Sequence, residues 1–201
     1  HKELDFVFEH CKKYDNTFDR LIIESNATVM PTFAELDSLL SYGKKLKVMI
    51  SDYGKLSKAR DQMVEFFEVN NIEYVLKKYY GDIENQHFGG WIDNTLCRDL
   101  LEPDNYVTKQ SALCAQVRLE NMHIFRGKLH RCSNSLFLSE LGVCVPNKND
   151  YIDLNDMSIS RDEKRKILNS FYDYPRKSCH YCTWKSGDSA IRYGAAEQVK
   201  Q

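Results

Sequence analysis

Four cysteines in the C-terminal half of the chain have a spacing typical of a metal site. They follow the pattern C-x17-C-x46-C-x2-C and are Cys114, Cys132, Cys179 and Cys182. A C-x2-C turn can direct two thiolates at one centre, and four thiolates suit either tetrahedral zinc or the four irons of a cubane cluster. The ligand count alone does not separate these two. A thioredoxin-like dithiol is disfavoured, because that motif follows the first strand of its fold, whereas this one lies near the end of the chain.

Polar residues at two predicted strand ends form a second candidate site. Ser51 and Asp52 close the strand in VMISDYG (48–54), and Asn26 closes the one in IESNAT (23–28). The carboxyl edge of a parallel sheet is where α/β proteins bind ligands. A simple turn that caps the next helix explains the same residues, and the residues alone favour that interpretation.

Several other residues that can do chemistry have simpler explanations. Gly89 and Gly90 in FGGW indicate a turn rather than a ligand site. His180, inside the C-x2-C, is interpreted as a turn residue that can hydrogen-bond cluster sulfurs. The cysteines outside the four-cysteine pattern are expected to be packed small residues: Cys11, Cys97 and Cys144.

Composition narrows the class of protein. The chain has 201 residues, 42% of them hydrophobic, and a formal charge of -1, which gives no electrostatic reason to expect nucleic acid or an anionic membrane as a partner. It has no apolar run near the ~20 residues that span a bilayer and no signal peptide, so we expect a cytoplasmic protein. Seven cysteines, an odd number, argue against a disulfide framework. Because His1 stands where a methionine would begin a protein and a helical pattern follows at once, we expect a fragment.

The first half of the chain alternates predicted strands and helices. Strands are expected at 20–27, 45–54 and 73–80, and this rhythm of βα units indicates a parallel sheet. Three units make only part of a sheet, since an eight-unit barrel needs more chain. Apolar spacing predicts helices at 4–11, 31–42 and 57–71. In the second of these, Thr32 and Glu35 form a capping box, and one apolar face is expected to contain Phe33, Leu36, Leu39 and Leu40.

After Tyr80 the pattern changes, and we expect a domain boundary close to residue 96. Residues 114–132 predict a hairpin that turns near Arg126 and Gly127, with a cysteine at each outer end. A capping box of Ser160 and Glu163 then begins a helix that leads to Cys179. The predicted organisation is a partial parallel sheet at 1–96 and a small α+β domain at 97–201.

Together these motifs resemble radical S-adenosylmethionine enzymes that carry a C-terminal auxiliary-cluster domain of the SPASM or shorter twitch kind. FRGKLHRC (125–132) is similar to the hairpin that ends in a cluster ligand in that family, and KSCHYC (177–182) to its closing C-x2-C. SNAT (25–28) and VMISDYG are similar to its strand ends. The resemblance implies a partial TIM-like barrel followed by a domain in which the four cysteines hold one auxiliary 4Fe-4S cluster. It further implies that Ser51, Asp52 and Asn26 lie near S-adenosylmethionine.

The defining motifs of the family are missing from this chain. No two cysteines are four apart, so the C-x3-C-x2-C that holds the cofactor-cleaving cluster is absent, as is the Gly-Gly-Glu that meets the methionine amine. We therefore expect the C-terminal part of a radical enzyme, inactive by itself. The alternative is a non-catalytic four-cysteine zinc scaffold or interaction module. The sequence indicates neither the substrate nor the oligomeric state.

Overall fold

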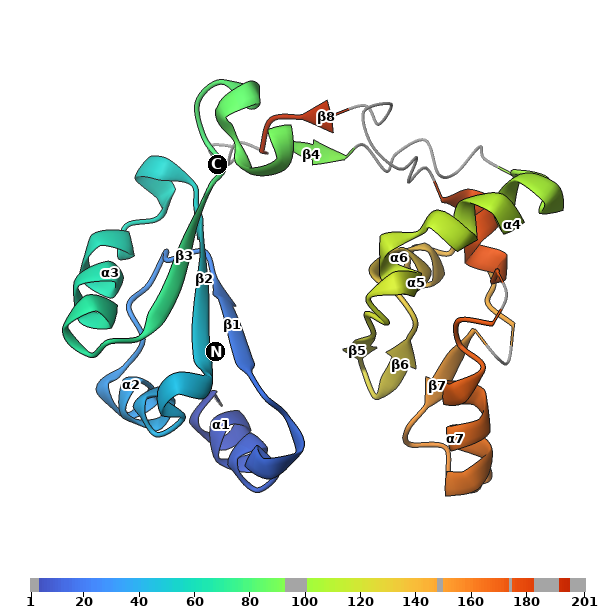
Figure 1. Ribbon diagram of the computed structural model, residues 1–201, viewed down its shortest axis with the longest axis horizontal. Coiled ribbons are helices and arrows are strands. Elements are labelled where there is room, and N and C mark those ends of the chain that lie inside the picture. The colour runs from blue at the N-terminus through green and yellow to red at the C-terminus, as the bar shows by residue number, and fades with distance from the viewer. Residues whose placement is uncertain (1–3, 93–100, 148–149, 174, 183–191, 196–201) are drawn as a thin grey trace. The chain divides into compact units, whose positions relative to one another are not determined.

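The computed structural model describes residues 4–92, 101–147, 150–173, 175–182 and 192–195 (Figure 1). The chain divides into two compact units. The first consists of His1–Trp91 together with Arg192–Gln201, and the second of Ile92–Ile191. The predicted boundary near residue 96 falls outside the described residues. None of the helices within the described ranges has the length and apolar character needed to cross a bilayer.

Unit 1 is built on a three-stranded parallel sheet in the order β1-β2-β3, as the βα rhythm predicted. Its strands and α-helices are α1 (Leu4–Lys12), β1 (Leu21–Ser25), α2 (Phe33–Leu40), β2 (Leu46–Asp52), α3 (Arg60–Val69) and β3 (Glu73–Lys78). Short 3₁₀ turns lie between these elements and beyond them: η1 (Asp15–Thr17), η2 (Gly43–Lys45), η3 (Gly54–Leu56), η4 (Ile83–Asn85) and η5 (His87–Gly89).

The core of unit 1 lies on one face of this sheet. β2 alternates strictly, with Leu46, Val48 and Ile50 buried and the residues between them half-buried. Side chains from α1, α2 and α3 pack against the buried face and include Phe8, Leu39 and Phe67. Within the described residues of unit 1, the three α-helices therefore cover the same side of the sheet.

The opposite face of the sheet is more polar. It carries Lys47, Met49 and Ser51 from β2, and an ion pair between Glu24 on β1 and Lys77 on β3, with Nζ and Oε1 3.0 Å apart. Parallel sheets are normally covered on both faces. Unit 1 by itself is thus a half-covered sheet as far as the described residues show.

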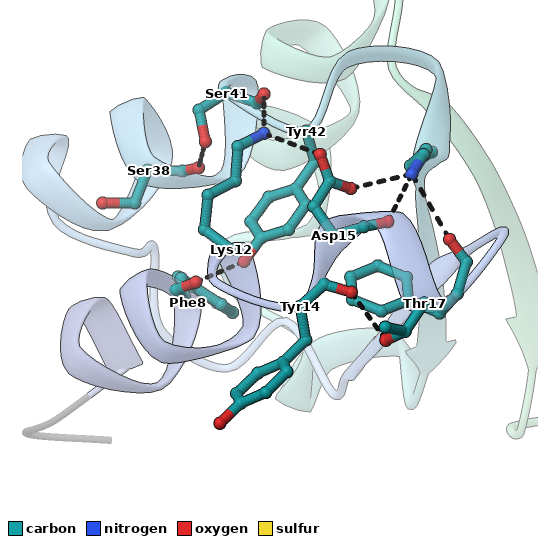
Figure 2. Close-up of polar contacts among 10 residues, drawn as sticks. Phe8, Lys12, Tyr14, Asp15, Thr17, Ser38, Ser41 and Tyr42 are labelled. Carbon is teal, nitrogen blue, oxygen red and sulfur yellow. Dashed lines mark hydrogen bonds and ion pairs between the residues drawn. The ribbon is translucent and has the colours of Figure 1, made fainter.

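Polar contacts join α1 to the segment that follows α2 (Figure 2). The Tyr42 hydroxyl donates to the Phe8 carbonyl oxygen, and the Lys12 ammonium donates to the Ser41 carbonyl at 2.7 Å. The Asp15 carboxylate pairs with Lys45 at 2.9 Å, and this bond lowers the Asp15 pKa. These bonds fix the N-terminal helix beside the sheet.

Two details of unit 1 test the sequence patterns. The predicted capping box of α2 is confirmed, because the Thr32 N–H donates to Glu35 and the Glu35 N–H donates to the Thr32 hydroxyl. The prediction for Phe33 is wrong, since its side chain is 85% exposed. Phe33 is the first residue of α2 and lies beyond the part of the helix that packs on the core.

A further, two-stranded sheet pairs β4 (Trp91–Ile92) with β8 (Arg192–Tyr193). Gly90 has a φ of 91°, and a side chain there would meet the Tyr193 carbonyl oxygen. The paired glycines therefore form a turn, as predicted, and also allow close approach of the C-terminal segment. The Gln86 side chain accepts a hydrogen bond from the Ala195 N–H at 3.0 Å.

Unit 2 combines a small antiparallel sheet with short helices. The sheet order is β5-β6-β7. Its elements are α4 (Asp104–Leu113), α5 (Ala115–Arg118), β5 (His123–Phe125), β6 (Lys128–His130), α6 (Ser133–Glu140), β7 (Tyr151–Asp153), α7 (Arg161–Asn169) and the 3₁₀ helix η7 (Lys177–Tyr181). The chain is thus of the mixed α/β class, with one parallel and one antiparallel three-stranded sheet.

The predicted hairpin of unit 2 is correct at its turn and wrong at its start. β5 and β6 pair antiparallel around Arg126 and Gly127, which have φ values of 48° and 76°, as a type I′ turn requires. The residues after Cys114 form α5 instead of a strand. β7 was not anticipated because it pairs with β6, a strand far from it in the sequence. The capping box of Ser160 and Glu163 at the start of α7 is confirmed.

Candidate metal centre

Each cysteine of the predicted set lies where one element ends and another begins. Cys114 separates α4 from α5, and Cys132 is the N-cap of α6. Cys179 lies within η7, and Cys182 ends it. Three separate segments of unit 2 therefore supply the four thiols.

The four sulfur-bearing residues line a single cavity. Besides the cysteines, its walls include Val107 and Val117, the polar side chains of Gln116 and Asn134, and the charged Arg131. The cavity has a volume of about 40 Å³. Residues 68 positions apart in the sequence are thereby brought to one place, from Cys114 to Cys182.

The sulfurs are not spaced as a set of metal ligands. Within the described residues, no three His, Cys, Asp or Glu side chains are arranged so that they could hold a metal ion. Binding would require the thiols to converge on the centre of the cavity.

Backbone and side-chain N–H groups point at three of the four sulfurs. Ser135 N–H donates to Cys132 Sγ at 3.3 Å, and Arg176 N–H donates to Cys179 Sγ at 3.4 Å. The Asn134 amide donates to Cys182 Sγ at 3.1 Å. Hydrogen bonds to an ionised acceptor are stronger than those to a neutral one, so this arrangement favours thiolates over thiols.

Burial opposes ionisation of these sulfurs when no cation is present. Removal from water raises the Cys132 pKa to about 12, and the neighbouring Cys179 and Cys182 add to this effect. Burial also raises the Cys179 pKa. The Arg131 guanidinium lowers both pKa values. Thiolate is the form of cysteine that binds a metal. The positive charge of a bound metal would therefore stabilise these cysteines in the ionised form that burial disfavours.

One buried polar atom in the cavity wall is consistent with an occupant. Gln116 Oε1 is buried and, among the described residues, has no hydrogen-bond partner. An unpaired buried acceptor costs about 1–3 kcal/mol. Four thiols with N–H donors directed at three of them are the donor set of a thiolate-ligated centre, and the Gln116 acceptor matches a hydrogen-bond donor such as water rather than sulfide.

The other cysteines and His180 lie outside this cavity. Cys144 is buried and packs with Leu138, and Cys11 is half-buried against the core of unit 1. Cys97 lies outside the described residues. The His180 ring hydrogen-bonds the Glu102 carbonyl oxygen at 2.7 Å, so the idea that it contacts a sulfur is not supported.

The second candidate site lies at the carboxyl end of β2 in unit 1, as its strand position predicted. Asp52 is 5% exposed, and its carboxylate accepts from Gly54 N–H and from Arg60, both at 2.9 Å. Asn26 is exposed, and its side chain accepts from the N–H and the hydroxyl of Thr28. Both side chains therefore stabilise turns, and their proposed role toward a cofactor stays a prediction.

The sequence patterns did not identify Ser57, which joins the two strand ends. Its buried hydroxyl donates to the Asn26 carbonyl at 2.7 Å and accepts from Tyr53 N–H at 2.9 Å. A serine before a helix is common as a cap, so no local signal marks this one. Arg131 was missed as well, although its position next to Cys132 offered a hint.

Comparison with known proteins yields no relatives. No protein-family model matches the chain, no curated protein is similar to it, and no solved structure matches it. Conclusions about function therefore depend on the residues and their geometry.

Proposed function

We propose that unit 2 binds a 4Fe-4S cluster through Cys114, Cys132, Cys179 and Cys182. We further propose that the chain is the C-terminal part of a radical S-adenosylmethionine enzyme. The observation that carries the first proposal is the cavity that all four cysteines line. The resemblance of the β5-β6 hairpin and the C-x2-C to the auxiliary-cluster domain supports the second.

The chain's own residues prepare such a site in three ways. Cys132 is held as the N-cap of α6, so the positive end of the helix dipole lies next to its sulfur. The N–H donors of Asn134, Ser135 and Arg176 satisfy sulfur lone pairs that burial removes from water. The hydrophobic walls, such as Val107, restrict access of water.

A cluster bound there would supply one-electron transfer. Four cysteine ligands leave no iron site open to a substrate, so we assign the site to electron transfer rather than to substrate binding. The electron would come from a substrate radical in the parent enzyme. The sequence and the cavity give no indication of the class of substrate.

The half-covered sheet of unit 1 supports the partial-barrel interpretation. Its helices lie on one face, and its other face carries the Glu24–Lys77 ion pair and Ser51. In a (βα) barrel, helices cover only the outer face of the sheet, and ligands bind at the carboxyl ends of the strands. We propose that the open face of this sheet is the inner face of such a barrel.

A zinc module is the second candidate, and the volume of the cavity favours it. Space of about 40 Å³ accommodates one ion with less rearrangement than a cluster of four irons and four sulfides. Four cysteines also form a common structural zinc site. In that case unit 2 would be a stabilised scaffold without redox chemistry.

Elemental analysis of protein prepared without oxygen distinguishes the two. We expect about four irons and four acid-labile sulfides per chain, with little zinc. Each Cys→Ala variant at positions 114, 132, 179 and 182 should lose iron after reconstitution, whereas Cys11→Ala and Cys144→Ala serve as matched controls and should retain it. One zinc per chain and no sulfide would refute the cluster. Full iron in Cys114→Ala or Cys132→Ala would refute the ligand set.

A further inference from the structure

The segment Arg131–Ser135 contributes more to the cavity than one cysteine. It supplies the Cys132 sulfur, the Arg131 guanidinium, the Asn134 amide and the Ser135 N–H within five residues. Metal ligation by this segment needs only the Cys132 sulfur. The others place positive charge and hydrogen-bond donors around sulfurs that become more negative when an electron arrives.

Arg131 is held firmly in this position. It is 2% exposed and lines the cavity with the four cysteines. Its guanidinium carbon lies 5.4 Å from the centroid of the Tyr172 ring, and its carbonyl oxygen accepts from the Tyr172 hydroxyl at 3.3 Å. A charge fixed away from water acts more strongly on its neighbours than a solvated one.

We propose that Arg131 and Asn134 raise the reduction potential of the cluster. The inference rests on the proposed function. Reduction adds one electron and makes a thiolate-ligated cluster more negative by one charge. A nearby cation or N–H donor stabilises the reduced form more than the oxidised form, whereas a carboxylate does the reverse. Arg131 and Asn134 are positioning residues that act through the cluster, so the cluster becomes a better electron acceptor.

The test is a dithionite titration of the anaerobically reconstituted chain, followed by electron paramagnetic resonance, with iron and sulfide measured in the same samples. In Arg131→Gln and in Asn134→Asp, the ratio of reduced to oxidised cluster at a fixed potential should fall about tenfold or more. For a one-electron couple, this corresponds to about 59 mV.

Two features of the design separate tuning from damage to the fold. Arg165→Gln removes the same charge from an exposed position on α7 and should leave the ratio unchanged. Asn134→Asp places an acidic residue in the first turn of α6, where the helix dipole favours it, so this variant should fold and remains decisive if Arg131→Gln does not.

The outcomes are distinguishable. A cluster in the unaltered protein with the same potential in Asn134→Asp and Arg131→Gln overturns the inference and leaves the proposed function standing. Zinc, or no metal, in the unaltered protein overturns both. A lower potential in Asn134→Asp and in Arg131→Gln, with no shift in Arg165→Gln, supports the assignment.

Discussion

Removing the metal should unfold unit 2 and leave unit 1 intact. The core of unit 1 joins buried residues from three helices and the sheet in one cluster, whereas in the described part of unit 2 the cluster around Leu138 has Cys144 as its other buried member. Val107, Leu136, Ile152 and Phe171 are also buried in unit 2 but lie outside that cluster. Burial of one leucine contributes about 1.5–3 kcal/mol. Coordination by four thiolates contributes on the order of 10 kcal/mol. Because domains are stable by only about 5–15 kcal/mol, loss of the metal removes most of the stability of unit 2.

Hydrogen exchange with mass spectrometry measures this effect in each unit separately. After chelation of the iron, peptides covering 128–141 should exchange about 1000-fold faster or more, since about 4 kcal/mol is sufficient for that change. Peptides covering 46–52 in β2 should be unchanged and provide the internal control. The Cys182→Ala variant should behave like the chelated protein, and Cys144→Ala should lose far less protection.

The reasoning fails if the peptides of 128–141 keep their protection when elemental analysis shows that the metal is gone. In that case the packing of unit 2 would be sufficient without coordination.

Three further predictions follow from the chain and from unit 1. Reconstituted protein incubated with dithionite and S-adenosylmethionine should form no 5′-deoxyadenosine above a control without protein, because the three-cysteine motif is absent; clear turnover would contradict the assignment as a partial enzyme. Ser57→Ala should lower the free energy of unfolding of unit 1 by about 1–3 kcal/mol, because the Asn26 carbonyl and Tyr53 N–H lose their partner. Ser38→Ala, at a half-buried position on α2, is the control in chemical denaturation. Thr32→Ala should lower the free energy of unfolding of unit 1 by about 1 kcal/mol. Hydrogen bonds from Thr32 lower the Glu35 pKa in the folded state. The contribution of these bonds to stability is therefore present above the unfolded pKa of about 4.3 and is lost as pH falls through the lower folded pKa. A Glu35→Gln variant whose stability keeps the same dependence on acid pH would contradict this explanation.

The sequence was sufficient where the cause of structure is local. The strand β2 and the capping boxes at Thr32 and Ser160 each depend on residues within a few positions of one another, and all three were predicted correctly. The turn at Arg126 and Gly127 is local in the same sense. The choice of four cysteines out of seven also came from spacing, since a C-x2-C and two partners form a pattern that can be read along the chain.

Tertiary structure decided whatever depends on distant segments. Cys114 lies at a break between two helices instead of a strand end, because α4 packs against η7, and no residue near Cys114 indicates that. The burial of Arg131 depends on Tyr172, 41 positions away. Ser57 becomes a bridge only when the ends of β1 and β2 lie side by side. Burial and hydrogen-bond partners are properties of the packed chain, and for that reason the spacing of the sequence can only propose the four thiols, whereas the fold determines their surroundings.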